Sequence, residues 1–204
     1  MFQLNAGNVI RIAWIIWVTW WIVAAARTNR MKQREPAREW LLRLAVMAAA
    51  FELLFHSGRD LGILNRRFVP HSQVVRDIGA ALTCIGLAFS IWARQHIGRY
   101  WSGSVSIRAD HQLIRTGPYS RIRHPIYTGI LVGLAGTLLA DGHYAAIAAF
   151  LIVLGGLSWK ALQEENLLRR EFGPAFEEHK RLTGFFFPRL SRPVSTGTPT
   201  ATPS

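Results

Sequence analysis

The amino-acid sequence predicts an all-α integral membrane protein with five transmembrane helices. Half of the 204 residues are hydrophobic, and they are concentrated in five long runs that contain few charged residues. The formal net charge is +12, and the basic residues fall mainly between these runs. That distribution is typical of a membrane protein with basic cytoplasmic loops. A soluble nucleic-acid-binding protein has no need of such apolar segments.

The predicted spans are 9–26, 40–55, 78–93, 126–140 and 144–159. Arg11 is the one charged residue of the first span, and the last three spans contain none. A helix needs about 20 residues to cross the hydrocarbon core, so these runs are slightly short. Flanking Trp and Arg side chains can complete them at the membrane interface. The alternative is that these runs are buried helices of a soluble protein. In that case, too little polar surface would remain to keep the chain in solution.

The charges of the loops predict how the spans are oriented. Basic residues are abundant after the first, third and fifth spans, and these three regions share one side if all five runs cross the membrane. The positive-inside rule assigns that side to the cytoplasm, across the inner membrane if the protein is bacterial. The 56–76 loop argues the opposite way, because it carries Arg59, Arg66, Arg67 and Arg76 on the other side. A role for this loop is left open.

Loop 94–125 and residues 160–190 lie on the same predicted side, and the aromatic residues of the loop need a packing partner. The fourth span follows an Arg-His-Pro tripeptide at 123–125. Proline suits the first turn of a helix, and a helix N-terminus next to Arg121 and a second arginine attracts a carboxylate or a phosphate. The alternative is that His124 only caps the helix and that the arginines only set the topology.

Residues 160–182 continue the fifth span as a polar helix, which a Gly-Pro pair at 173–174 divides into two pieces. Glu164 and Glu165 are adjacent carboxylates just outside the span, where they can hold a cation such as an ammonium or a sulfonium. The alternative is a solvent-exposed face on which Glu165 pairs with Arg169 at i,i+4 spacing. Such a pair contributes only tenths of a kcal/mol.

Three glycines of the fourth span predict a close helix contact. Gly129 and Gly133 have the small-xxx-small spacing that lets another helix approach, and Gly136 follows them. We expect them to pack against the fifth span, because the short connecting turn makes these two helices an antiparallel hairpin. The same spacing permits dimerisation, and the oligomeric state is left open.

Other chemistries lack the residues that they require. Cys84 is the single cysteine, so neither a disulfide framework nor a Cys-based zinc site is expected. The seven histidines show no metal-ligand spacing. No G-x-G-x-x-G motif follows a strand, and no P-loop or G-x-S-x-G motif occurs. Residues 191–204 are rich in Ser, Thr and Pro and predict a disordered tail.

The segments HQLIRTGPYSRIRHPIYTG (111–129) and EENLLRREFGPAFEEHKRL (164–182) resemble the isoprenylcysteine carboxyl methyltransferase family and its phospholipid-methyltransferase relatives. The resemblance covers about half of the chain. It implies one membrane methyltransferase domain over residues 1–190. In such a domain, a cytosolic cofactor-binding loop (94–125) and the C-terminal helices (160–190) enclose S-adenosyl-L-methionine.

The resemblance also implies which residues act. The residues that it assigns to cofactor binding are His111, Gln112, Leu113, Ile114, Tyr119, His124, Pro125, Ile126, Tyr127 and Glu164. Lys160 stands where family members carry an arginine that meets the substrate carboxylate, and lysine keeps the charge but lacks the bidentate fork of arginine. An amine acceptor would have to lose a proton, and Glu165 or a histidine is then the candidate base.

The resulting expectation is a carboxyl O-methyltransferase that depends on S-adenosylmethionine and acts on a lipophilic acceptor, first of all the carboxylate of a prenylcysteine-like substrate. Methylation of a phospholipid amine or of another small lipophile is the alternative within this class. Outside it, a nicotinamide-dependent membrane reductase and a non-enzymatic membrane protein remain open. Membrane lipid is an expected partner, and neither nucleic acid nor metal is expected.

Overall fold

The structure, a computed structural model, describes residues 5–26, 37–55, 62–98 and 113–189. These residues form helices and turns. The described residues contain two isolated β-bridges but no β-strand. The all-α prediction is therefore confirmed for this part of the chain, and the predicted tail 191–204 lies outside it. The helices are α1 (Ala6–Ala26), α2 (Ala37–Phe55), η1 (Gly62–Asn65), α3 (Gln73–Ile97), η3 (Gly117–Ser120), α4 (Pro125–Asp141), α5 (Tyr144–Phe172) and α6 (Pro174–Leu182).

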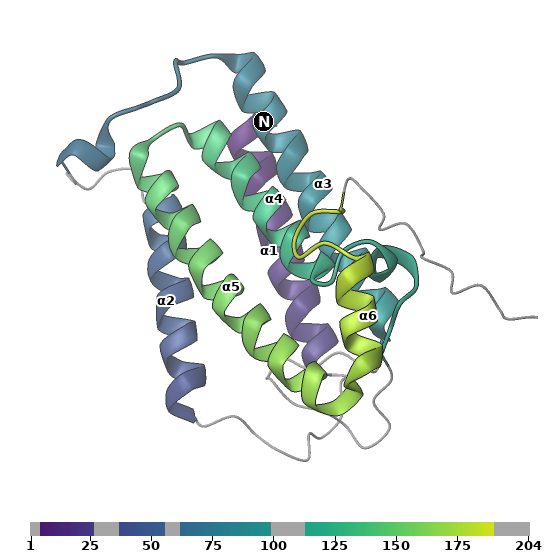
Figure 1. Ribbon diagram of the computed structural model, residues 1–204. Helices are drawn as coiled ribbons and strands as arrows, with labels where there is room; N and C mark the ends of the chain where they lie inside the picture. Colours follow the sequence, from purple (N-terminus) through teal and green to yellow (C-terminus); the bar gives the residue numbers. More distant parts are fainter. Residues whose placement is uncertain (1–4, 27–36, 56–61, 99–112, 190–204) are drawn as a thin grey trace, which may run out of the picture.

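The five long helices run side by side in alternating directions, and the short helix α6 lies beside the lower end of the bundle (Figure 1). Three of the described helices are long and apolar enough to cross a membrane, namely Ala6–Ala24, Gln73–Ile97 and Tyr144–Phe172. Helix α4 is also apolar but has 17 residues. The prediction of five crossing helices therefore requires α2 and α4 to cross as well as these three.

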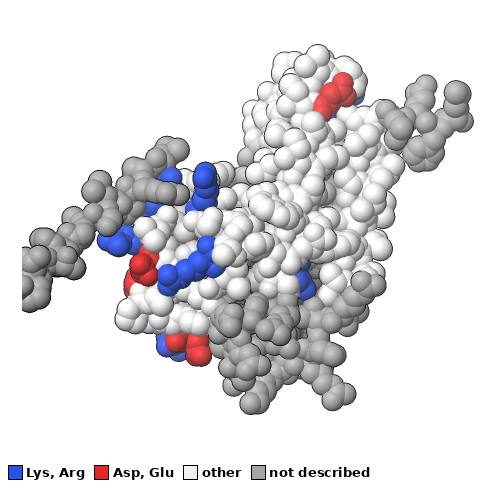
Figure 2. Space-filling model, turned by 90° about the vertical axis from the view of Figure 1, so that its right-hand side faces the viewer, with Lys and Arg blue, Asp and Glu red and all other residues white. Residues whose placement is uncertain are grey.

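Apolar side chains on the outside of the bundle agree with a lipid environment. Ile15, Ile85 and Leu151, from α1, α3 and α5, are each more than half exposed. Much of one face of the molecule carries neither Lys, Arg, Asp nor Glu (Figure 2). Soluble proteins rarely expose large apolar patches, so exposed apolar side chains on three long helices favour a lipid environment. These helices indicate an integral membrane protein.

The glycines of α4 pack against α3, so the expected contact with the fifth span is wrong. A Cβ atom on Gly129 would lie 2.6 Å from the carbonyl oxygen of Gly86 in α3. Close packing needs small residues on both helices, and α3 supplies them opposite α4. The glycines of α5, Gly155 and Gly156, would meet no atom within 4 Å. The α3–α4 pair therefore forms the tightest contact of the bundle.

Tryptophan side chains attach α1 to this pair. Trp14 Nε1 donates a hydrogen bond of 3.0 Å to Thr137 Oγ1 in α4. Trp17 Nε1 donates one of 2.6 Å to Ser90 Oγ in α3. Each indole N–H thus has a partner inside an otherwise apolar bundle, where an unpaired donor would be costly.

The Gly-Pro break is confirmed and brings the C-terminal residues back to the bundle. Helix α5 ends at Phe172, Gly173 adopts a positive φ of 48°, and α6 begins at Pro174. Residues 183–187, which follow α6, lie against the segment that precedes α4 (Figure 1). The start of α4, the polar part of α5 and the end of α6 therefore meet at one end of the molecule.

Candidate active site

Backbone hydrogen bonds fix the start of α4. The N–H groups of Arg123 and His124 donate to the carbonyl oxygens of Gly184 (2.9 Å) and Phe185 (3.2 Å). The N–H of Gly184 in turn donates to the carbonyl of Arg121 at 3.0 Å. Residues 183–187 belong to the region 160–190 that the sequence predicts at this site, but none of the individual residues of this segment was assigned a role from the sequence. Its run of three phenylalanines, directly before a polar tail, is the signal that could have found it.

Glu165 lies at the centre of a buried charge cluster. Its Oε1 accepts a hydrogen bond of 2.6 Å from Arg123 Nε and lies 3.3 Å from His124 Nε2. Lys180 Nζ in α6 lies 3.2 Å from Oε2. The Glu165 side chain is only 4% exposed. One carboxylate thus joins α5, the start of α4 and α6.

The alternative pairing of Glu165 with Arg169 is wrong. Arg169 Nε donates instead to Glu177 Oε1 in α6 at 2.6 Å, and both of these side chains are about half exposed. The reason is burial. Glu165 turns inward, where Arg123 and Lys180 neutralise it, whereas Arg169 remains at the surface.

Glu164, next to Glu165 in the sequence, has different surroundings. Its Oε1 accepts a hydrogen bond of 2.7 Å from the Tyr127 hydroxyl and lies 3.7 Å from Lys160 Nζ. Its Oε2 lies 3.7 Å from His124 Nδ1. The Glu164 side chain is 23% exposed. A partly accessible carboxylate, a cation, a phenol and an imidazole therefore converge at the start of α4.

Aromatic rings surround His124. Its ring is stacked on Tyr127 with 5.6 Å between centroids and 6° between planes. Phe185 and Phe186 approach the same imidazole edge-on, at 5.0 Å and 6.3 Å. The site is thus lined by flat apolar surfaces beside a small number of polar groups, which is the usual composition of a small-molecule site.

Tyr119 approaches the cluster from η3. Its hydroxyl lies 3.5 Å from the carbonyl oxygen of Ala93, and its ring is stacked on His96. Burial raises the pKa of Tyr119, and the negative charge of Glu164 raises it further. The phenol therefore keeps its proton and can donate to the Ala93 carbonyl.

The remaining predicted cofactor residues are placed less centrally. Leu113 and Ile114 are half-buried in the segment before η3, whereas Pro125 and Ile126 are buried in the first turn of α4. His111 and Gln112 lie outside the described residues. The structure therefore brings His124, Tyr127, Glu164, Glu165 and Lys160 together. Their function remains a prediction.

His179 in α6 is a buried histidine that the sequence analysis missed. It is 5% exposed. Burial, together with the positive charges of Arg115 and Arg123, lowers the pKa of His179 to about 4. No motif marked this histidine, and its position on the inward face of a short amphipathic helix is the available signal.

Chemically, this arrangement can hold a ligand that carries both a cationic and an anionic group. Glu164 offers negative charge at the site, while Lys160 and the N-terminus of α4 offer positive charge. Among the residues that the structure describes, no group of three His, Cys, Asp or Glu side chains could hold a metal ion.

Known proteins similar to this chain include methyltransferases. Residues 79–170 match the isoprenylcysteine carboxyl methyltransferase (ICMT) family. A probable protein-S-isoprenylcysteine O-methyltransferase of Oryza sativa subsp. indica is 31% identical over 137 residues, which are 66% of this chain and 70% of that protein. A solved structure of a eukaryotic intramembrane Ras methyltransferase ICMT matches 77% of this chain and 54% of its own, with 20% identity and a TM-score of 0.46.

Two other relatives have names from metal resistance. The nickel-cobalt-cadmium resistance protein NccN of Alcaligenes xylosoxydans xylosoxydans is 39% identical over 56% of this chain and 53% of its own. The cobalt-zinc-cadmium resistance protein CzcN of Cupriavidus metallidurans is 39% identical over 47% of this chain and 44% of its own. The chain thus spans about half the length of these two relatives. Since the match to the Oryza sativa protein covers more than two thirds of that protein, this chain belongs to the isoprenylcysteine carboxyl methyltransferase family.

Proposed function

We propose that this protein is an integral membrane methyltransferase that transfers a methyl group from S-adenosyl-L-methionine to a lipophilic acceptor. The observation that carries the proposal is the position of Glu164. Its partly accessible carboxylate lies beside Tyr127 and His124, at the N-terminus of α4. Family membership supports the same activity.

The chemistry of the site fits this methyl donor. S-adenosylmethionine carries a positively charged sulfonium and ammonium, a carboxylate and a flat adenine ring. Glu164 suits the positive charges, and the N-terminus of α4 suits the carboxylate. The stacked rings of His124 and Tyr127, with Phe185 edge-on, offer apolar surfaces to a planar base.

Methyl transfer from a sulfonium needs positioning more than it needs a strong base. When bound, S-adenosylmethionine would supply the methyl group: an acceptor lone pair would bond to the methyl carbon, and the electron pair of the broken C–S bond would stay on sulfur and neutralise the sulfonium. A carboxylate acceptor is already ionised at neutral pH. The site therefore acts mainly by alignment and exclusion of water.

Within this proposal Glu165 has a positioning role. Its carboxylate is buried and is held by Arg123, His124 and Lys180. A base must reach the proton that it removes, and these contacts already occupy Glu165. We assign it to holding α4 and α6 in place around Glu164.

Lys160 is the residue that we propose for the acceptor carboxylate. Its ammonium lies 3.7 Å from Glu164 Oε1 and 5.6 Å from the centroid of the Tyr127 ring. This position supports a prenylcysteine-like carboxylate as the first acceptor to test. A phospholipid amine and a small lipophilic acid or thiol are the next acceptors to test.

We further propose that all five long helices cross the membrane and that the site faces the cytoplasm. The alternating helix directions support this arrangement, because the polar part of α5, α6 and the start of α4 then share one side (Figure 1). The positive-inside rule assigns that side to the cytoplasm. The acceptor would enter from the bilayer, through a gap between spans beside Tyr127.

The experiment that tests the activity is binding of S-adenosylmethionine to the full chain in detergent. Glu164→Gln should weaken binding roughly tenfold or more, since a charged contact is lost. Glu171→Gln is the matched control, because Glu171 is an exposed glutamate on the same helix. Equal binding by both variants would contradict the assigned role of Glu164.

Acceptor screening then uses an S-prenylated cysteine, a phosphatidylethanolamine and a lipophilic thiol, each with radiolabelled methyl donor. Lys160→Gln should raise KM for a carboxylate acceptor, while Lys160→Arg should preserve it. Absence of methyl-donor binding by a well-folded chain, together with stabilisation by a reduced nicotinamide, would replace the methyltransferase proposal with a reductase.

A further inference from the structure

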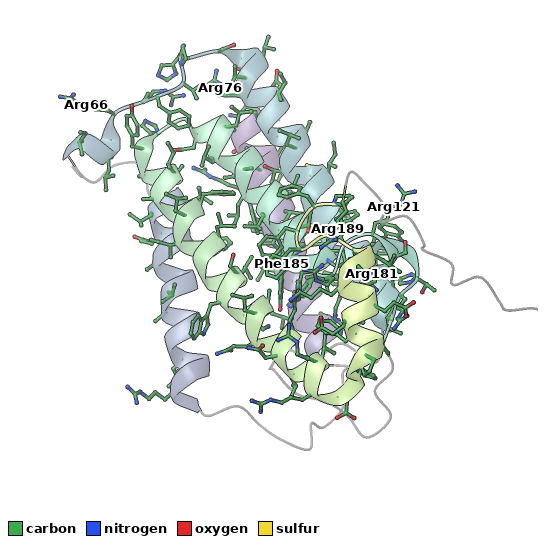
Figure 3. The ribbon with its side chains drawn as sticks, in the orientation of Figure 1. Arg66, Arg76, Arg121, Arg181, Phe185 and Arg189 are labelled. Atoms are coloured by element: carbon green, nitrogen blue, oxygen red, sulfur yellow. The ribbon has the colours of Figure 1, made fainter. Side chains whose placement is uncertain are left out.

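A cavity with three arginines in its lining lies at the end of the bundle where α1, α3 and α5 begin. Its volume is about 240 Å³. Three arginines line it, Arg11 from α1, Arg67 from the loop before α3, and Arg76 from the first turns of α3. Figure 3 shows Arg76 at this end, whereas Phe185 and Arg181 lie farther down the bundle. The methyltransferase proposal does not use this cavity.

Backbone hydrogen bonds build one wall of the cavity. The N–H of Phe68 donates to the carbonyl of Gly142 at 2.9 Å, and the N–H of Tyr144 donates to the carbonyl of Arg66 at 3.1 Å. These bonds hold the loop before α3 against the turn between α4 and α5. Gly142 has a positive φ of 73°, and a Cβ atom there would lie 2.7 Å from the Arg67 guanidinium. The turn is thus shaped to let Arg67 reach the cavity.

The charge of the cavity is positive. Its one carboxylate, Asp141, is already held by His143, whose Nδ1 and backbone N–H lie 3.0 Å and 3.2 Å from Oδ2. Within the described part of the chain, no carboxylate forms an ion pair with the three arginines. Each guanidinium has five N–H donors, and the hydrogen bonds of Arg67 to Val69 and of Arg76 to Gln73 use only a few of them.

The cavity also lies where a membrane surface is expected. The three helices that are long enough to span all begin at this end, at Ala6, Gln73 and Tyr144. Their N-termini add partial positive charge. A positively charged pocket at the ends of spanning helices lies at the depth of lipid headgroups.

We propose that this cavity binds a phosphate group, presented by an anionic phospholipid headgroup or by free phosphate. Arginine matches phosphate geometry through paired hydrogen bonds, and the arginines converge from three segments that are distant in the sequence. The proposal gives the basic residues Arg67 and Arg76 a function. By the positive-inside rule alone, they lie on the wrong side of the membrane.

The test measures the melting temperature of the full chain in a neutral detergent. The probes are dioctanoyl phosphatidylglycerol, the phosphate-free dioctanoylglycerol, and inorganic phosphate. The variant Arg11→Gln/Arg76→Gln removes two charges from exposed cavity positions and leaves Arg67 in place against Gly142. The control Arg66→Gln/Arg170→Gln removes two charges from exposed arginines that do not line the cavity.

Phosphatidylglycerol should raise the melting temperature of wild type and control, whereas dioctanoylglycerol should not. In the cavity variant the apparent dissociation constant should increase roughly tenfold or more. A response to phosphatidylglycerol alone identifies a lipid headgroup, and an equal response to inorganic phosphate identifies free phosphate. The proposal is overturned if neither probe stabilises wild type, or if cavity variant and control respond alike. None of these readouts depends on methyl transfer.

Discussion

Arg123 and Glu165 form a buried ion pair that joins the start of α4 to α5. Arg123 Nε lies 2.6 Å from Glu165 Oε1, and the two side chains are 8% and 4% exposed. Arg123 also donates to the carbonyl oxygens of Thr183 (2.6 Å) and Lys180 (3.3 Å). One guanidinium therefore fixes three chain segments around the carboxylate of Glu164.

We predict that Glu165→Ala destabilises the protein by about 3–5 kcal/mol, because it leaves the buried Arg123 guanidinium without its counter-ion. Unfolding in detergent, followed by circular dichroism, measures this loss. Glu164→Ala is the matched control, since it removes an adjacent but partly exposed carboxylate. Similar losses for the two variants would show that burial does not distinguish the two glutamates.

A second prediction concerns the hydrogen bond between Tyr127 and Glu164. Tyr127→Phe should weaken binding of S-adenosylmethionine about tenfold, because hydrogen bonds to charged groups contribute about 1.5–3 kcal/mol. The free energy of unfolding should also fall, by at most about 1.5–3 kcal/mol, because the same hydrogen bond is lost within the protein while the aromatic ring keeps its packing. Calorimetric titration gives the affinity, with Tyr144→Phe, at the opposite end of the bundle, as the control. Unchanged binding by Tyr127→Phe would separate this phenol from the cofactor site.

Local patterns predicted much of this architecture. Apolar runs located the helices, the Gly-Pro pair located the break between α5 and α6, and the Arg-His-Pro motif located the start of α4, where the candidate site lies. The structure also brings loop residues before α4 together with the glutamates of α5. The helices and the break were predictable because they depend on residues close together in the sequence. The meeting of the loop with the glutamates was predictable because alternating helices place these segments on one side of the bundle.

The features that the sequence could not predict are contacts between helices, because they depend on which face of each helix meets which neighbour. Adjacent residues of a helix point about 100° apart, so Glu164 and Glu165 enter different surroundings only once α4 and α6 are in place. The glycines of α4 meet α3 because Gly86 lies opposite Gly129. No local pattern contains that correspondence between two helices.

This helix contact leads to a third prediction. Gly129→Ala should destabilise the protein by about 1–3 kcal/mol, because its methyl group would collide with the backbone of Gly86 and with Ser90. Gly155→Ala is the matched control, since no neighbouring atom lies within 4 Å of its added methyl group. Alanine also has the higher helix propensity, so the control should be neutral or more stable. Equal melting temperatures for both variants would contradict the observed α3–α4 packing.

The fourth prediction is a loss of stability in acid that comes from His179. The pKa of His179 is about 4 in the folded chain, below its ordinary value of 6.5. Between these two values the unfolded state binds a proton that the folded state does not. The free energy of unfolding therefore falls as the pH decreases from 6.5 towards 4, by at most about 3 kcal/mol from this group.

His179→Asn should remove this contribution, because asparagine does not titrate. Melting temperatures of wild type and variant, measured at about pH 7 and about pH 5, give the two differences to compare. Carboxylates and the other histidines titrate in both proteins, so their effects cancel in the comparison. The wild type should lose more stability than the variant between the two conditions. If both lose the same amount, His179 is protonated in the folded chain, and the positive charges of Arg115 and Arg123 do not suppress its protonation.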